Sequence, residues 1–498
     1  MDRSRIGLIL GLVLLVLMLI LPAPDGLSDR AMRAGGVTLL MACWWMTEAI
    51  PISATALVPL AIFPLLGILD AKTTAVNYGH NYVLMLLAGF FIAKAFESHG
   101  LHRRIALVLI NRIGTSRRRI VLSFMVATAL LSMWIANVAV TLLMLPIALA
   151  VATKEEEADS SSSGAFALCL MLAVAHAASI GGTGSLVGTP PNMVFVGIVK
   201  TMYPGAPDIS FFEWMQIGLP FVIVFIPITW AYLTWFHGIS GQFAGSEEVI
   251  HSELQALGKT SPAEKRVMTV FVLTGLGWIF RKDLVFGPLT VTGWSSLLGV
   301  EDMVHDATVA VFSAVALFLI PTGSEQSGNR KLLTWPEAQS VPWGVVMIVG
   351  GGYAIAKSFT ETGLADWLGV QLAFIGILPM ALIIILVILF MTFITEINSN
   401  TATANIFLPV LATMAVAGQM HPFLLMIPAT FACSCAFMLP SGTGPNAVIF
   451  GSGKVTIPEM SKTGFWLNIL SVVVLSIIMI AVAVPVLNLT VDIPVWAR

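Results

Sequence analysis

Long apolar runs, separated by short polar segments, extend along almost the whole chain. A helix needs about 20 largely apolar residues to cross a hydrocarbon core about 30 Å thick, and most of these runs approach or exceed that length. The pattern predicts an all-α polytopic membrane protein with about 11 transmembrane helices. The runs are Ile6–Leu21, Val37–Leu69, Val83–Phe96, Ala165–Val199, Phe221–Phe236, Val267–Phe280, Ala307–Ile320, Val345–Phe359, Leu372–Ile394, Leu424–Phe450 and Leu467–Val486.

The first run, Ile6–Leu21, could be a secretory signal or a membrane helix. It is long for a signal, and no A-x-A-like cleavage site follows it. We therefore expect a first membrane helix.

Composition excludes a soluble protein. Hydrophobic residues make up 57% of the chain and charged residues only 10%, whereas an ordinary soluble domain has about 25% charged residues. The net charge of −2 argues against nucleic acid as a partner. The four cysteines lie in apolar stretches without metal-ligand spacing, so we expect small buried residues.

Basic residues predict the orientation of the chain in the membrane. With Arg3 and Arg5 in the cytoplasm, sixteen Lys and Arg residues fall inside and seven outside, and the dense stretch Arg103–Arg119 is inside. This bias favours a cytoplasmic N-terminus and an external C-terminus, hence an odd number of crossings. Lys94 and Lys357 fall within predicted spans. Both are near helix ends, where a long side chain can reach the interface, so we favour that role over substrate binding.

Self-comparison reveals an internal repeat. Phe90–Lys94 resembles Tyr353–Lys357 at an offset of 263 residues, and the same offset relates Asn137 to Asn400. Matches in the same order over about 100 residues are not expected by chance.

The repeat continues at a slightly smaller offset. Gly188–Asn192 matches Gly442–Asn446 at an offset of 254, because the first copy contains a polar loop, Lys154–Gly164, that the second lacks. Two homologous halves in a membrane chain are typical of secondary transporters, and an odd number of crossings in each would invert one half relative to the other. The predicted divisions are an N-terminal helix (1–34), a first repeat (35–236), a cytoplasmic connector (237–264) and a second repeat (265–490).

Each repeat contains a polar segment flanked by short apolar arms. Ser132–Thr141 in the first half corresponds to Thr395–Thr403 in the second, where seven of nine side chains can form hydrogen bonds. The arms are too short for two full crossings, so we expect re-entrant hairpins at about 120–150 and 376–415. An unwound tip offers carbonyl oxygens and helix N-termini together, which suits a cation beside an anion.

A second break follows in each repeat. Gly181–Asn192 and its counterpart Ser441–Asn446 contain Thr-Pro-Pro-Asn and Thr-Gly-Pro-Asn, which cannot continue a helix. The prediction is a broken helix at about 165–200 and another at 422–452, whose freed amides and Thr and Asn side chains could hold carboxylate oxygens. A simple proline kink is the alternative.

Four motifs in order resemble the divalent anion/sodium symporter (DASS) family over about Trp44 to Gly453. They are Trp45–Pro51, Gly188–Asn192, Ser399-Asn400-Thr401 and Ser441–Asn446. The resemblance implies a bacterial inner-membrane, elevator-type homodimer with a scaffold domain and a mobile transport domain. It also implies a C4-dicarboxylate, citrate or sulfate as substrate and sodium as coupling ion.

The family's site residues carry over onto matching positions. For sodium, the resemblance implies Ser132, Asn137 and Gly188 in the first half, and Thr395, Asn398, Asn400 and Gly442 in the second. For the anion it implies Asn137, Thr189, Pro190, Asn400, Thr401 and Thr443.

The first tip departs from the family pattern. The family has Ser-Asn-Thr in both halves, but this chain has Ala136-Asn137-Val138 in the first. Two hydroxyls are missing, so the first ion site is either weakened or held by backbone oxygens and Asn137, and the anion could bind asymmetrically. Gly444 in place of a proline is a second, smaller departure.

The sequence therefore predicts a secondary transporter of a divalent anion, most simply a sodium-coupled dicarboxylate transporter with no cofactor. The alternatives within transport are a sulfate or other inorganic anion transporter, or a sodium-independent exchanger. A membrane enzyme would need a poised nucleophile or a metal cluster, and the sequence offers neither. An anion channel would differ in lacking saturable counterflow.

Overall fold

Helices form nearly all of the regular structure, which confirms the predicted all-α class. The computed structural model describes residues 2–113, 116–158, 163–242, 246–286, 289–323, 330–373 and 378–498. Part of the polar loop Lys154–Gly164 and the start of the predicted 376–415 segment lie outside the described residues. One addition to the prediction is a small antiparallel hairpin formed by β1 (Leu284–Phe286) and β2 (Leu289–Val291), whose apolar and β-branched residues favour strands.

The two halves found by self-comparison contain matching series of helices. The first consists of α6 (Asn81–Ser98), α7 (Leu101–Ile113), α8 (Arg117–Ser132), α9 (Asn137–Ala158), α10 (Ser163–Gly182), α11 (Pro190–Met202) and α12 (Phe211–Phe236). The second consists of α18 (Trp343–Thr362), α19 (Leu364–Leu372), α20 (Met380–Ile394), α21 (Asn400–Ala417), α22 (Phe423–Cys433), α23 (Gly444–Phe450) and α24 (Ile457–Ile478). Helices α9 and α21 begin at Asn137 and Asn400, the two residues related by the repeat.

The remaining elements precede, connect and follow these halves. The chain begins with α1 (Arg3–Ile20), α2 (Asp29–Thr47), α3 (Ile52–Thr55), α4 (Val58–Leu65), α5 (Ala71–Val76) and η1 (Asn77–Gly79). Between these two series of helices lie α13 (Ser246–Ala256), α14 (Pro262–Ile279), α15 (Trp294–Leu298), α16 (Asp306–Leu319) and α17 (Trp335–Gln339). The last elements are η4 (Met479–Ala483), α25 (Val484–Val486) and η5 (Val495–Ala497).

The apolar run Val37–Leu69 is not one span. Helix α2 ends where Glu48 adopts a left-handed conformation (φ 50°), and Pro51 follows before the short helices α3 and α4. Seven helices or helical stretches of the described chain are long and apolar enough to cross a membrane, and four apolar ones are shorter. The count of about 11 crossings stays a prediction.

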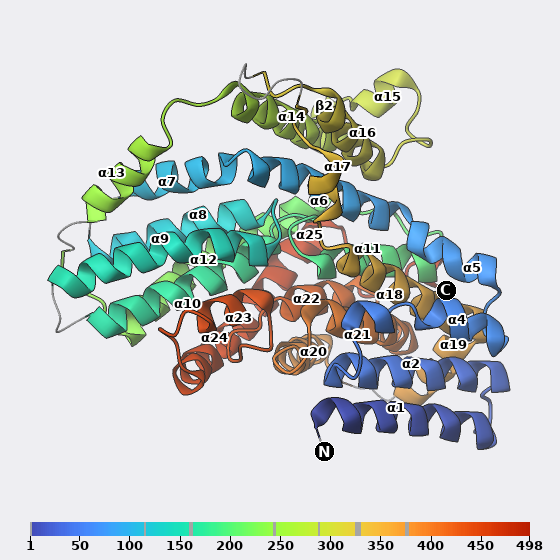
Figure 1. Ribbon diagram of the computed structural model, residues 1–498. Helices are drawn as coiled ribbons and strands as arrows, with labels where there is room; N and C mark the ends of the chain where they lie inside the picture. Colours follow the sequence, from blue (N-terminus) through green and yellow to red (C-terminus); the bar gives the residue numbers. More distant parts are fainter. Residues whose placement is uncertain are drawn as a thin grey trace.

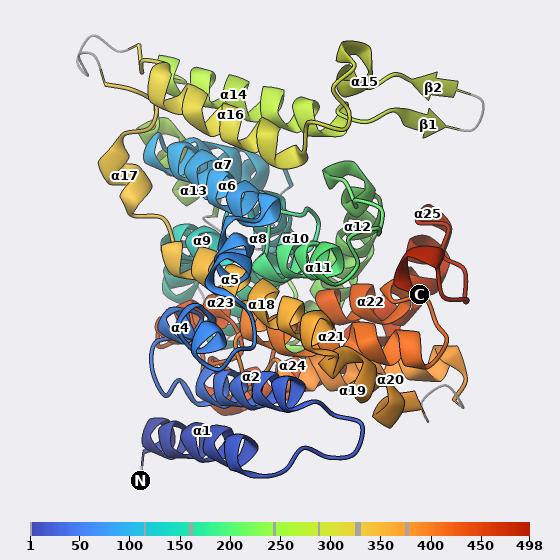
Figure 2. The same cartoon turned by 90° about the vertical axis from the view of Figure 1, so that its right-hand side faces the viewer.

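The helices that contain the breaks lie in the middle of the molecule. Helices α1 and α2 lie side by side along one edge, and α14 and α16 along the opposite edge (Figures 1 and 2). Between them, α10 packs on α8 and α9, while α21 packs on α18 and α22. This arrangement brings the breaks of both halves together.

Candidate functional site

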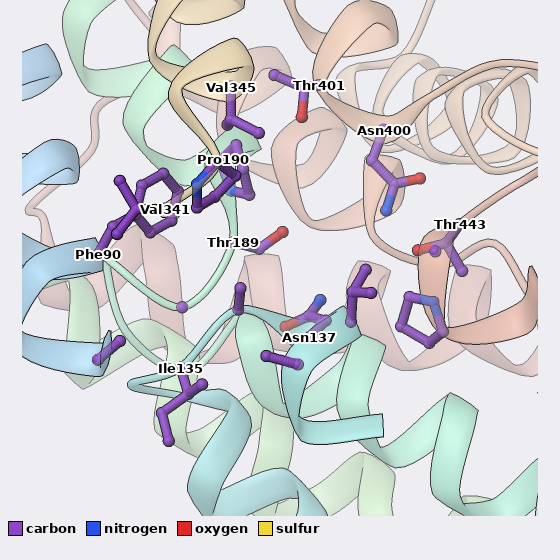
Figure 3. Close-up of a pocket in the computed structure, with 18 of the residues that line it drawn as sticks. Phe90, Ile135, Asn137, Thr189, Pro190, Val341, Val345, Asn400, Thr401 and Thr443 are labelled. Atoms are coloured by element: carbon purple, nitrogen blue, oxygen red, sulfur yellow. The ribbon is translucent and has the colours of Figure 1, made fainter. Parts of the chain in front are cut away.

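A cavity of about 560 Å³ lies where the breaks of the two halves meet. All six residues that the sequence predicts as anion contacts line it. In Figure 3 they come from different helices and surround one open space. The lining residues from the breaks are Ile135, Ala136, Asn137, Val138, Ala139, Val187, Gly188, Thr189, Pro190, Ser399, Asn400, Thr401, Ser441, Gly442, Thr443, Gly444 and Pro445.

The N-termini of three helices line the cavity. Helices α9, α11 and α21 begin at Asn137, Pro190 and Asn400, which all line the cavity. The N-terminus of a helix carries roughly half a positive charge and unpaired N–H groups. Three of them around one space can stabilise carboxylate oxygens without a buried cation at the tips.

Hydroxyl groups at these helix starts are free for a ligand. Thr189 and Thr443 occupy the N-cap positions of α11 and α23, but neither side chain caps its own helix. Ser399 occupies the N-cap of α21, again without a side-chain capping bond. The equivalent residue before α9 is Ala136, whose carbonyl accepts from Val140 N as the Ser399 carbonyl accepts from Thr403 N. The first tip therefore lacks one hydroxyl that the second presents.

Oxygen atoms gather behind the first tip. The Asn137 amide oxygen accepts from Ser132 Oγ at 2.7 Å. On the same side lie the carbonyl oxygens of Ala178 and Gly188, and neither can donate a proton. With the amide turned over, its nitrogen donates to the carbonyls of Ala178 (3.3 Å) and Gly188 (3.2 Å) and to Ser132 Oγ (2.7 Å), so this is the orientation that satisfies these groups when no cation is bound. Asn137 can thus be satisfied either by these carbonyls or by a cation among the oxygens.

A second cluster of oxygens lies at the matching place in the other half. Thr395 Oγ1 is 2.9 Å from both Asn400 Oδ1 and the Cys433 carbonyl oxygen, and its single proton can serve only one of them at a time. Thr395 is fully buried. The Asn398 side-chain oxygen accepts from Ser399 N at 2.9 Å.

These two clusters suit a small hard cation. Sodium prefers oxygen ligands, and α8, α10, α20 and α22 all end close to a cluster residue, so their negative C-terminal ends add to the attraction. Gly188 fits here because a Cβ would lie 2.9 Å from the Ser132 carbonyl oxygen.

Two asparagines predicted as possible carboxylate ligands have a structural role. Asn192 and Asn446 are fully buried, and each donates from Nδ2 to two backbone carbonyls of its own break. Asn192 donates to Gly182 O (3.3 Å) and Ser185 O (2.7 Å). Asn446 donates to Ala436 O and Leu439 O, at 3.1 and 3.0 Å. They hold the unwound chain in shape rather than contact the cavity.

Glu396 has a role that the sequence pattern does not indicate. In the sequence it is one of several polar residues of the second tip. Its side chain is 3% exposed and points away from the cavity toward the α22–α23 break. Oε1 accepts from Phe437 N, Met438 N and Asn468 Nδ2, and Oε2 accepts from Leu439 N, at 2.6 to 3.0 Å. One carboxylate thus fixes the break that carries Gly442 and Thr443.

The two departures from the family pattern touch each other. A methyl group of Val138 lies directly over Gly444, so that a Cβ at Gly444 would overlap it. Val138 is 40% exposed and lines the cavity. An apolar side chain in the first half therefore occupies space that only glycine leaves free in the second.

Solved structures show the same fold at low sequence identity. The chain aligns with MtrF of Neisseria gonorrhoeae, described as illuminating a class of antimetabolite efflux pumps, with a TM-score of 0.57, 13% identity and 96% of each chain covered. It aligns with the YdaH transporter of Alcanivorax borkumensis with a TM-score of 0.55, 14% identity, and 96% and 98% of the chains covered. At this identity the likeness concerns the fold alone.

Sequence relatives are much closer. Residues 3–488 match the family described as the sodium:sulfate symporter transmembrane region. The chain is 42% identical over 497 residues to a sodium-dependent dicarboxylate transporter of Staphylococcus saprophyticus, covering 98% of this chain and 93% of the relative. It is 41% identical over 496 residues to the Staphylococcus aureus protein of the same name, with the same coverage. The chain therefore belongs to the sodium:sulfate (divalent anion/sodium) symporter family and is a multi-pass plasma-membrane transporter, not an enzyme.

Proposed function

We propose that this protein couples sodium entry to the movement of a C4-dicarboxylate across the plasma membrane. The observation that carries the proposal is the cavity bounded by three helix N-termini and backed by two oxygen clusters. The names of the relatives, sodium-dependent dicarboxylate transporters, support the same substrate class. A cavity of about 560 Å³ is ample for a four-carbon dianion.

Coupling follows from the two amides that face both ligands. In Figure 3 the nitrogen ends of the Asn137 and Asn400 amides face the open space, while their oxygens belong to the oxygen clusters. A sodium ion in a cluster holds the amide oxygen inward, so the NH₂ group stays directed at the anion. Without sodium the Asn137 amide gains by turning over toward Ala178 and Gly188, and its donor is lost to the anion. Each ligand thereby increases the affinity for the other.

The transport cycle we propose is of the elevator type. In it, α8–α11 and α20–α23 move together as the transport domain, with α8–α9 and α20–α21 as re-entrant hairpins. Packing between the halves supports movement as one body, since α9 and α10 pack on α23, and α11 packs on α21 and α22. A homodimer would hold the scaffold still, and the sequence-based divisions 1–34, 35–236, 237–264 and 265–490 remain part of this proposal.

A ligand panel tests the proposal and separates it from sulfate transport. We expect succinate to raise the melting temperature of the purified protein in sodium chloride, but not in choline chloride, and to be taken up by proteoliposomes along a sodium gradient. Sulfate should do neither at equal concentration. Sulfate uptake without succinate uptake, or succinate uptake indifferent to sodium, would contradict the proposed substrate or coupling.

Restoring the first tip should strengthen binding. The double substitution Ala136→Ser and Val138→Thr returns one hydroxyl to the N-cap and one to the cavity wall, each worth about 1 kcal/mol, or several-fold in affinity. We expect a lower KM for succinate, a steeper sodium dependence, or both. The control is Val345→Thr, which adds the same hydroxyl to the opposite wall. Identical sodium and succinate curves in the double variant and the wild type would show that the first tip is not a binding element.

A further inference from the structure

A lysine forms part of the cavity wall opposite the tips. Lys94 and Glu97, both on α6, line the cavity, and Lys94 Nζ lies 3.2 Å from Glu97 Oε1. Their side chains are 23% and 42% exposed. The sequence favours a lysine that extends only to the membrane interface, but its place in the cavity wall gives it access to the anion.

The repeat places a second pair of the same kind on α18. Lys357 is related to Lys94 by the offset of 263, and its Nζ lies 2.9 Å from Glu361 Oε1. Its exposure, 28%, is similar. In this conformation Lys357 is not among the residues that line the cavity.

The two pairs lie at opposite ends of the bundle. Next to the first pair, His99 Nε2 is 2.8 Å from the carbonyl oxygen of Leu332, in the segment that the basic residues place in the cytoplasm. Next to the second pair, the Thr362 carbonyl accepts from Ser28 Oγ at 3.2 Å, in the external loop between α1 and α2. The cavity is therefore lined by one lysine of the two, Lys94, which lies at the cytoplasmic end.

A lysine held this way can exchange its glutamate partner for a carboxylate of the substrate. Pairs of Glu and Lys one helical turn apart, partly exposed to water, are weak, so an arriving carboxylate competes with the glutamate at little cost. The lysine ammonium is a compact charge on a flexible stem and imposes no fixed geometry, which suits a contact that must be released.

We infer that Lys94 and Lys357 are the cations at the two openings of the transport path, which we call the mouth cations. Each contacts a substrate carboxylate on one side of the membrane only. Lys94 acts while the cavity faces the cytoplasm, and Lys357 acts once the cavity has moved to the external face. Glu97 and Glu361 hold the respective lysine when no anion is present. The inference rests on the proposed transport cycle.

Sided transport measurements test this. Labelled succinate uptake is followed in everted vesicles, which expose the cytoplasmic face, and in right-side-out vesicles. We expect Lys94→Gln to raise the KM about two- to fivefold in everted vesicles only. Glu97→Gln should lower it there. In right-side-out vesicles only, Lys357→Gln should raise the KM and Glu361→Gln should lower it. Lys94→Arg should restore the wild-type KM, and Lys462→Gln and Lys72→Gln serve as surface controls for the two faces.

The outcomes separate this inference from the proposed function. Wild-type vesicles that take up no succinate would refute the proposed function itself. Normal wild-type uptake, with each variant changing both faces equally or neither, would refute the mouth cations and leave the function intact. If Lys94→Gln does not fold, the opposite-signed effect of Glu97→Gln decides the cytoplasmic side, and an unchanged KM there refutes it.

Discussion

Replacing Asn400 with alanine should abolish sodium-driven uptake while leaving the protein folded. The substitution removes an amide oxygen from the second oxygen cluster and an NH₂ group from the cavity in one step. Each contact to a charged ligand is worth about 1.5–3 kcal/mol, so losing both lowers combined affinity by about two to four orders of magnitude. The fold should survive because Thr395 Oγ1 keeps the Cys433 carbonyl as its acceptor.

Uptake by proteoliposomes and the melting temperature without ligand decide this prediction together. Asn111→Ala is the matched control, since Asn111 is an exposed amide on α7. We expect normal uptake from the control, and no uptake with a near-normal melting temperature from Asn400→Ala. Wild-type transport by the Asn400 variant would show that the second tip is not part of the binding site.

The arrangement of the breaks could be predicted because the same pattern of breaks occurs in both halves of the sequence. A polar or proline-containing segment inside an apolar run must interrupt a membrane helix, and here each interruption occurs at the same place in both halves. Asn137 and Asn400 can therefore be paired by the repeat alone, and both prove to be the first residue of a helix that lines the cavity.

The directions of side chains could not be predicted in this way. Asn192 and Thr189 stand three residues apart in the same motif, yet Thr189 lines the cavity and Asn192 donates to carbonyls behind it. Their directions depend on how the broken ends pack. The contact between Val138 and Gly444 joins residues from different halves, so no local pattern indicated it.

The orientation of Glu396 is the most consequential feature that the sequence did not reveal. In a string of polar residues at a tip, a glutamate looks like another cavity residue, and only the three successive amides of Phe437, Met438 and Leu439 explain its direction. Three unpaired N–H groups in an unwound buried segment need an acceptor, and one carboxylate satisfies all of them.

Glu396→Gln should accordingly destabilise the transport domain and weaken sodium binding. Glutamine offers one oxygen in place of two, so its NH₂ group must face either the Leu439 amide or the three donors now shared by Oε1. An unsatisfied buried donor, together with the loss of charge-assisted bonds, costs about 2–4 kcal/mol. The α22–α23 break would loosen, and Gly442, where a Cβ would lie 3.0 Å from Glu396 Oε2, would move with it.

The measurement is the melting temperature of the purified variant across a sodium titration. Glu361→Gln is the control, because the side chain of that glutamate is 45% exposed and its carboxylate pairs with Lys357 one helical turn away. We expect the Glu396 variant to melt several degrees lower without sodium and to need more sodium for the same stabilisation, whereas the control should follow the wild type. A Glu396→Gln protein with unchanged melting and sodium response would mean that the break is held by backbone packing alone, and that the carboxylate does not position the second ion site.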